Sequence, residues 1–287
     1  HNLLPSKELF LIWFGLKMQQ ERQYSFRKKA VDSLIDLWSD AGLKVVELKG
    51  NSIGRYYPKP ELRYSCDFDA FLIDNSNPEE SGYEKGNKIV ETTGVSVDCK
   101  YYKNSSFYWK GVFVENHQFC TPVRGNREMK HLERTLRQLV GTVDFNALFL
   151  MEHMWSHFFE DALTLKQLAD WVVMRKCCWN DVDEQLFERE ARACGFWRFA
   201  ESINQITDTI LTGGDMQFSD KSTERLWQSI LNGGGSVQMN NGWHTRFRLI
   251  SNYLSNGWKY RQFSNHGALF SLARTCCAFI FDRKPTI

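Results

Sequence analysis

The sequence predicts an α+β protein: N-terminal helices lead into a small mixed-sheet domain, and an all-helical domain follows. Short strand-like apolar runs, bounded by glycine and proline, are confined to residues 43–119. From about residue 126 almost to the end, apolar residues recur at the three- and four-residue spacing of helices. A chain of 287 residues is long enough for two cores, so we expect two domains, residues 1–125 and 126–287.

The composition is that of a soluble globular protein. Because 36 basic residues nearly balance 34 acidic ones, no charge excess indicates nucleic acid or membrane as a partner. The longest apolar runs, such as residues 147–151, are far shorter than the ~20 residues of a membrane span. The eight cysteines show no CxxC zinc spacing, which favours a reducing cytoplasm. The chain opens without a basic-led apolar stretch, so we expect no secretory signal.

The first elements are helical. Apolar residues between Lys7 and Ala41 recur at helical steps and predict two amphipathic helices, the second closed by Gly42. The run LKVVELKG at residues 43–50 predicts a strand at the edge of the sheet that ends in a glycine turn. Two prolines within residues 56–65 then predict a loop.

The stretch YSCDFDAFLI at residues 64–73 predicts a strand that carries two aspartates. Side chains alternate between the two faces of a strand, so Asp67 and Asp69 point the same way. Two neighbouring carboxylates repel each other, and burying either one unpaired is costly. The pair therefore predicts a cation between the two side chains.

A helix and a hairpin follow this strand. Residues 75–94 begin with a cap-like Asn/Ser cluster and end in glycine, which predicts a helix. Residues 95–102 and 107–119 alternate as the two strands of a hairpin, with Lys110-Gly111 at or near its turn. Four residues of the second strand share one face: Phe113, Glu115, His117 and Phe119.

Three motifs in this order, LKGNS at 48–52, YPKPELRYSCDFD at 57–69 and VEN at 114–116, resemble the nucleotidyltransferase superfamily of the polymerase-β-like fold. In that superfamily a glycine-led turn precedes a D-x-D strand and a third carboxylate on a neighbouring strand. More narrowly, the succession LKG, YP-x-P-x-x-R, D-x-D and VE-x-H is similar to the uncharacterised nucleotidyltransferase-like family found in bacteria. The resemblance covers residues 43–119, and the helical remainder only loosely.

The resemblance implies transfer of a nucleoside monophosphate from a nucleoside triphosphate, with ATP as the expected donor, to an acceptor hydroxyl. The acceptor is a small molecule, an RNA or a protein. Mg²⁺ or Mn²⁺ is the implied cofactor, because these cations prefer carboxylate oxygens. Three residues are implied as catalytic carboxylates and metal ligands: Asp67, Asp69 and Glu115. Asp98 is the rival third carboxylate if the hairpin is shifted by one strand.

The resemblance also implies phosphate contacts at the turn after Leu48, where main-chain N–H groups at a helix start favour negative charge. The residues concerned are Lys49, Gly50, Asn51, Ser52 and Arg63. The commoner superfamily pattern has glycine directly followed by serine, so Asn51 is a departure. This departure leaves open a non-catalytic member that binds a nucleotide or a partner. The resemblance leaves open a further alternative, the toxin or antitoxin of a two-component system, because related small nucleotidyltransferases serve there.

Residues 151–161, MEHMWSHFFED, predict a helix with His153, His157 and Asp161 on one face. A structural role is the favoured interpretation, ahead of contact with substrate and of zinc binding. In related proteins a similar helix, followed by one with an aspartate such as Asp170, packs beside the active cleft. Three histidines are therefore candidate cleft contacts: His117, His153 and His157.

Overall fold

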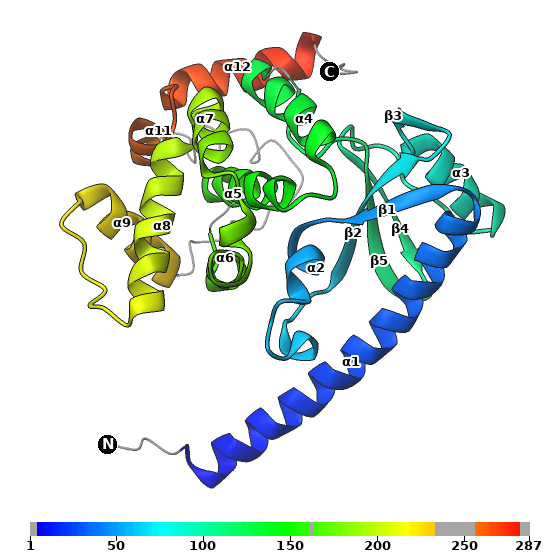
Figure 1. Ribbon diagram of the computed structural model, residues 1–287, viewed down its shortest axis with the longest axis horizontal. Coiled ribbons are helices and arrows are strands. Elements are labelled where there is room, and N and C mark those ends of the chain that lie inside the picture. Colours follow the sequence, from blue (N-terminus) through cyan, green and yellow to red (C-terminus); the bar gives the residue numbers. More distant parts are fainter. Residues whose placement is uncertain (1–4, 125, 161–162, 233–255, 282–287) are drawn as a thin grey trace, which may run out of the picture. The chain divides into compact units, whose positions relative to one another are not determined.

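A computed structural model of the chain describes residues 5–124, 126–160, 163–232 and 256–281 (Figure 1). The chain forms two compact units, His1–Gln118 and Phe119–Ile287. The first unit combines helices with a mixed sheet and the second is helical, so the α+β class is confirmed. The domain division expected at residue 125 stays a prediction.

The first unit is built on a five-stranded sheet with the order β1-β2-β5-β4, and β3 pairs with β2. The strands are β1 (Leu43–Glu47), β2 (Asp67–Asp74), β3 (Asn77–Ser81), β4 (Asn104–Trp109) and β5 (Val112–His117). The central pair, β2 and β5, is parallel, and the other pairs are antiparallel. Strand β1 ends the order, as expected for an edge strand.

The core of this unit lies between one face of the sheet and two helices, α1 (Lys7–Asp40) and α3 (Tyr83–Thr92). Helix α1 contributes Ala30, Leu34 and Trp38. The strands contribute side chains that share one face: Phe68, Ala70, Leu72, Phe107, Trp109, Val112 and Val114. Because strand side chains alternate, the residues between these, including Asp69 and Glu115, lie on the opposite face of the sheet.

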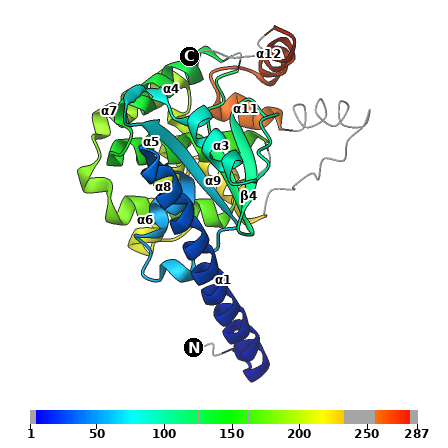
Figure 2. The same ribbon diagram turned by 90° about the vertical axis from the view of Figure 1, so that its right-hand side faces the viewer.

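Helix α1 is one continuous helix of 34 residues, so the prediction of two helices was wrong. The polar stretch between the two apolar segments consists mainly of good helix formers and contains no proline, so nothing ends the helix there. The N-terminal part of α1 extends beyond the sheet (Figures 1 and 2). Its large apolar side chains are exposed: Leu9, Phe10, Leu11, Ile12, Trp13, Phe14, Leu16 and Met18.

The hairpin turns at Lys110 and Gly111, as predicted, with both residues at positive φ. Its first strand is β4, however, and the expected strand over residues 95–102 was wrong. The two-residue turn places Trp109 opposite Val112, so the strand that precedes the turn is the one that pairs with β5. Residues 95–102 contribute an isolated bridge from Asp98 to Ser106.

Strand β3 was not predicted, because its proline and polar residues match a loop better than a strand. The helix expected within residues 75–94 is present as α3. The loop expected over residues 56–65 is also present, with a single 3₁₀ turn at Pro60–Leu62.

The second unit consists of helices (Figure 1), and four of the described helices begin at a polar cap. Asn126, Thr164, Asp183 and Asp220 each accept a hydrogen bond from an N–H of the first turn. The helices are α4 (Arg127–Leu139), α5 (Val143–Glu160), α6 (Leu165–Cys177), α7 (Glu184–Cys194), α8 (Trp197–Thr212), α9 (Lys221–Leu231), α11 (Gly257–Phe263) and α12 (Ala268–Phe281). In the described parts of the chain, no helix has the length and apolar character needed to cross a membrane.

Replacement of Gly86 by alanine should destabilise the first unit. Helix α3 lies so close to β2 that a Cβ at Gly86 would collide with the side chain of Leu72, which is fully buried. Overpacking costs about 1–3 kcal/mol, more than the ~1 kcal/mol that alanine gains over glycine in a helix. We expect Gly86→Ala to lower the free energy of unfolding by about 1–2 kcal/mol in urea titrations followed by circular dichroism.

Gly15 provides the matched control, because it also lies within a helix, but a Cβ added there would meet no described side chain within 4 Å. Gly15→Ala should leave the free energy of unfolding unchanged or raise it by up to ~1 kcal/mol. A stabilising Gly86→Ala substitution would contradict the close packing of α3 on β2.

Candidate active site

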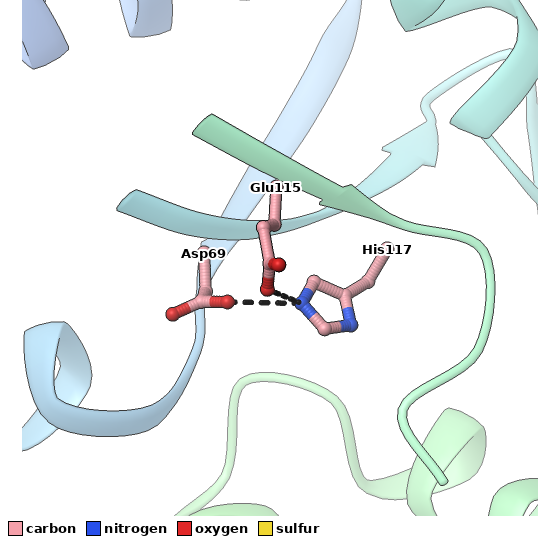
Figure 3. Close-up of side chains that lie close together, drawn as sticks. All are labelled: Asp69, Glu115 and His117. Carbon is pink, nitrogen blue, oxygen red and sulfur yellow. Dashed lines mark hydrogen bonds and ion pairs between the residues drawn. The ribbon is translucent and has the colours of Figure 1, made fainter. Parts of the chain in front are cut away.

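The candidate site is set by the parallel pairing of β2 and β5. Their register places Asp69 opposite Glu115 and Phe71 opposite His117. Directly paired residues point to the same face of a sheet. Asp69, Glu115 and His117 therefore gather on the face that α1 and α3 do not cover (Figure 3).

The donor atoms of these three side chains all lie within 4.8 Å of one another. Nε2 of His117 is 3.0 Å from Oδ1 of Asp69 and 3.5 Å from Oε2 of Glu115. A ring nitrogen between two carboxylate oxygens is favourable only when it carries a hydrogen, so we assign the proton to Nε2. The side chains of Asp69 and His117 are 4% and 2% exposed, whereas that of Glu115 is 26% exposed.

Lys49 completes the group. Its ammonium nitrogen Nζ lies 2.5 Å from Oδ1 of Asp69 and 3.3 Å from Oε2 of Glu115. The backbone of Lys49 has a φ of 54°, in the left-handed region that residues other than glycine rarely adopt. Two hydrogen bonds hold the turn: the N–H of Leu48 donates to the carbonyl of Asp69, and the hydroxyl of Ser52 donates to the carbonyl of Lys49.

The charges in the site stabilise one another. Burial alone raises the pKa of Asp69, but the hydrogen bond from His117 and the charge of Lys49 outweigh it and hold this pKa well below its usual range. Burial lowers the pKa of Lys49, but the charges of Asp69 and Glu115 outweigh it and raise this pKa. At neutral pH, Asp69 is therefore ionised and Lys49 is cationic.

The other aspartate of the D-x-D motif, Asp67, stands at the start of β2, opposite Phe113. It lies on the same face as Asp69, although its oxygens are not among the donor atoms that lie within 4.8 Å of one another. Its charge still acts on Lys49. Of the three expected carboxylates, Asp69 and Glu115 are thus in contact range and Asp67 is next to them.

Asp98 lies apart from this group. It pairs with Ser106, which pairs with Glu115, so two strand spacings, or roughly 10 Å, separate Asp98 from Glu115. Its carboxylate accepts the N–H of Lys100 and is 52% exposed. The carboxylate beside Asp69 is therefore Glu115.

The residues expected at the phosphates lie on or beside a short helix, α2 (Lys49–Gly54), which contains Gly50 and Asn51. Ser52 is buried, and its hydroxyl is engaged with the carbonyl of Lys49. Arg63 is also buried and lies beside Gly54 at the end of this helix.

His153 and His157 lie on α5 in the second unit, with their rings in edge-to-face contact at a centroid distance of 4.3 Å. The ring of Phe149 stacks on His153. Within the described residues, these histidines join no group of three metal-binding side chains, and Asp161 lies outside those residues. Asp170 is buried in α6. Contact of these residues with the cleft stays a prediction.

Two residues lie nearer to the carboxylates than the sequence predicted. His117 was expected as a cleft contact, but it lies among the carboxylates. Its position two residues after Glu115, on the same face of one strand, could have indicated this. Lys49 was expected at the phosphates and lies between Asp69 and Glu115. Its left-handed backbone has no sequence signal, because the residue is not glycine.

The model of an uncharacterised nucleotidyltransferase family matches residues 2–211. This span contains the whole sheet, the candidate site and the helices as far as α8, which is well over half of the chain. No curated protein matches the chain. No solved structure matches it either. The family match extends beyond residues 43–119, on which the motif resemblance was based, and the chain belongs to this uncharacterised nucleotidyltransferase family.

Proposed function

We propose that the protein is a metal-dependent nucleotidyltransferase. It transfers a nucleoside monophosphate from a nucleoside triphosphate, ATP in the first instance, to an acceptor hydroxyl, and pyrophosphate is released. The observation that carries the proposal is the convergence of Asp69, Glu115 and His117 from the central parallel strands, in a chain that belongs to a nucleotidyltransferase family.

The donor set fits a hard divalent cation. Asp69 and Glu115 offer carboxylate oxygens, which Mg²⁺ and Mn²⁺ prefer, and Asp67 on the same face can supply another. His117 donates its Nε2 hydrogen to Asp69 and so orients that carboxylate toward the cation. A divalent cation held here supplies neutralisation of the triphosphate charge and alignment of the attacking hydroxyl.

The remaining roles follow from exposure and charge. Glu115 is more exposed than Asp69, which suits it to take the proton of the acceptor hydroxyl. The phosphate contacts are assigned to residues on or beside α2: Lys49, Gly50, Asn51, Ser52 and Arg63. The donor is drawn from the nucleoside triphosphates of the cytoplasm, and the acceptor hydroxyl belongs to a small molecule, an RNA or a protein.

The first test removes a charge from the site without changing its shape. We expect Asp69→Asn to lower nucleotidyl transfer at least about 100-fold, because the cation loses a buried charged ligand. The measurement is incubation of the protein with each labelled triphosphate and a cell extract, followed by quantification of labelled product. Asp74→Asn is the control, since Asp74 ends the same strand and pairs with Lys85 instead. Wild-type labelling by Asp69→Asn would contradict the assignment.

A non-catalytic nucleotide-binding member is the second candidate. It is favoured by Asn51, which separates Gly50 from Ser52. It is also favoured by the position of Asp67, whose carboxylate is not part of the group formed by Asp69, Glu115 and His117. Titration calorimetry distinguishes the two candidates. Triphosphate binding that requires Mg²⁺ and is lost in Asp69→Asn supports the enzyme, whereas binding that is independent of metal and of this substitution supports the non-catalytic member.

The orienting role of His117 gives a second prediction. His117→Ala should weaken Mn²⁺ binding by about 10–100-fold, the usual effect of removing a group that orients a metal ligand. Free Mn²⁺ is measured by electron paramagnetic resonance during titration of the protein.

The control is His131→Ala, because His131 forms a similar contact, 2.8 Å long, with Glu190 in the other unit. His131→Ala should leave Mn²⁺ binding unchanged. Equal Mn²⁺ affinities in His117→Ala and wild type would show that Asp69 does not need this hydrogen bond.

A further inference from the structure

The ammonium group of Lys49 lies where the proposed cation would bind. It contacts Oδ1 of Asp69 and Oε2 of Glu115, which are the oxygens nearest to Nε2 of His117. Magnesium and calcium ions bind carboxylate oxygens at about 2.0–2.6 Å. A cation at that distance and an ammonium at its present position would repel each other strongly, since like charges a few ångströms apart in a buried site are poorly screened. The two positive groups therefore compete for the same two oxygens.

The backbone and the side chain of Lys49 differ in their freedom to move. The backbone is held beside Asp69 by the N–H of Leu48 and by the hydroxyl of Ser52. The side chain is a flexible four-carbon stem that carries a compact charge, and it is 20% exposed. The ammonium can therefore leave the carboxylates by side-chain rotation, while the turn and the sheet stay in place.

The charge balance favours such an exchange when a triphosphate is present. Without metal, the ammonium offsets the repulsion between Asp69 and Glu115. A divalent cation offsets more of the negative charge of these two carboxylates than the ammonium does. The displaced ammonium then needs another anion. The triphosphate is one, and Lys49 opens α2, the helix to which the phosphates are assigned.

We infer that Lys49 is an exchangeable internal cation: its ammonium neutralises Asp69 and Glu115 in the metal-free protein and moves from them to the triphosphate when the divalent cation binds. This inference rests on the proposed function, because it assumes the metal site. It makes Lys49 the residue that couples the binding of metal to the binding of nucleotide.

The first test measures Mn²⁺ affinity in the absence of nucleotide, by electron paramagnetic resonance. Lys49→Met removes the competing charge and keeps a side chain of similar length. We expect it to bind Mn²⁺ at least about tenfold more tightly than wild type. Lys85→Met is the matched control, because Lys85 pairs with Asp74 at 3.0 Å in the same unit, and it should bind Mn²⁺ as wild type does.

The second test uses the wild-type protein and needs no substitution. An acylating reagent modifies free amines, and peptide mass spectrometry reports the extent of modification at each lysine. In the metal-free protein, Lys49 should react slowly, because its ammonium is ion-paired and largely buried. Saturating Mn²⁺ should raise its modification severalfold, while modification of Lys85 should not change.

The outcomes separate the exchange from the metal site itself. If wild type binds Mn²⁺ and Lys49→Met binds it no more tightly, the exchange is wrong and the metal site stands. Unchanged modification of Lys49 in the Mn²⁺-bound protein leads to the same conclusion, even if Lys49→Met does not fold. If neither protein binds Mn²⁺ at millimolar concentration, the metal site is wrong, and both the exchange and the proposed metal-dependent function are overturned.

Discussion

The register between β2 and β5 is the constraint on which the candidate site depends. Asp69 and Glu115 face each other because the parallel pairing aligns them, and Phe71 aligns with His117 in the same way. A shift of one residue would turn every side chain of a strand to the opposite face. The core prevents such a shift, because Phe68 and Val114 are buried against α1 and α3. Apolar packing on one face of the sheet thus fixes the polar chemistry on the other.

This arrangement brings like charges together, which opposes folding unless other groups compensate. Lys49 provides a charge, and His117 provides a hydrogen bond. Their effect is visible in the pKa of Asp69, which stays well below its usual range although burial alone would raise it. Such concentrations of perturbed, mutually dependent groups are typical of functional sites. The strained backbone of Lys49 fits the same interpretation, because strain persists only where the surrounding contacts enforce it.

Much of the fold was predictable, because local sequence patterns indicate many of its helices, strands and turns. The D-x-D strand, the turn at Lys110 and Gly111 and the capped helices all have periodic or turn-specific signals. The division of α1 into two helices was a local error, because the stretch between its apolar segments consists mainly of good helix formers. The error in the hairpin arose where longer-range contacts decide. Pairing with β5 selects residues 104–109 over residues 95–102 as the first hairpin strand.

The site was predictable to a similar depth. The motif order indicated Asp69 and Glu115, and alternation along a strand placed His117 on the same face as Glu115. The contact of Lys49 with both carboxylates could not be predicted, because it depends on a left-handed turn at a residue other than glycine. The separation of Asp67 from the contacting group likewise depends on side-chain positions that a strand pattern does not specify.

The proposed function requires that Asp69 and Glu115 bind one divalent cation on the sheet face opposite α1 and α3. The most direct measurement is anomalous X-ray diffraction from crystals of the protein grown with Mn²⁺ and a non-hydrolysable nucleoside triphosphate. We expect one manganese peak at about 2.0–2.6 Å from a carboxylate oxygen of each residue, with the Lys49 ammonium displaced toward the phosphates. A nucleotide-bound crystal with manganese elsewhere, and Lys49 still between Asp69 and Glu115, would contradict this metal site.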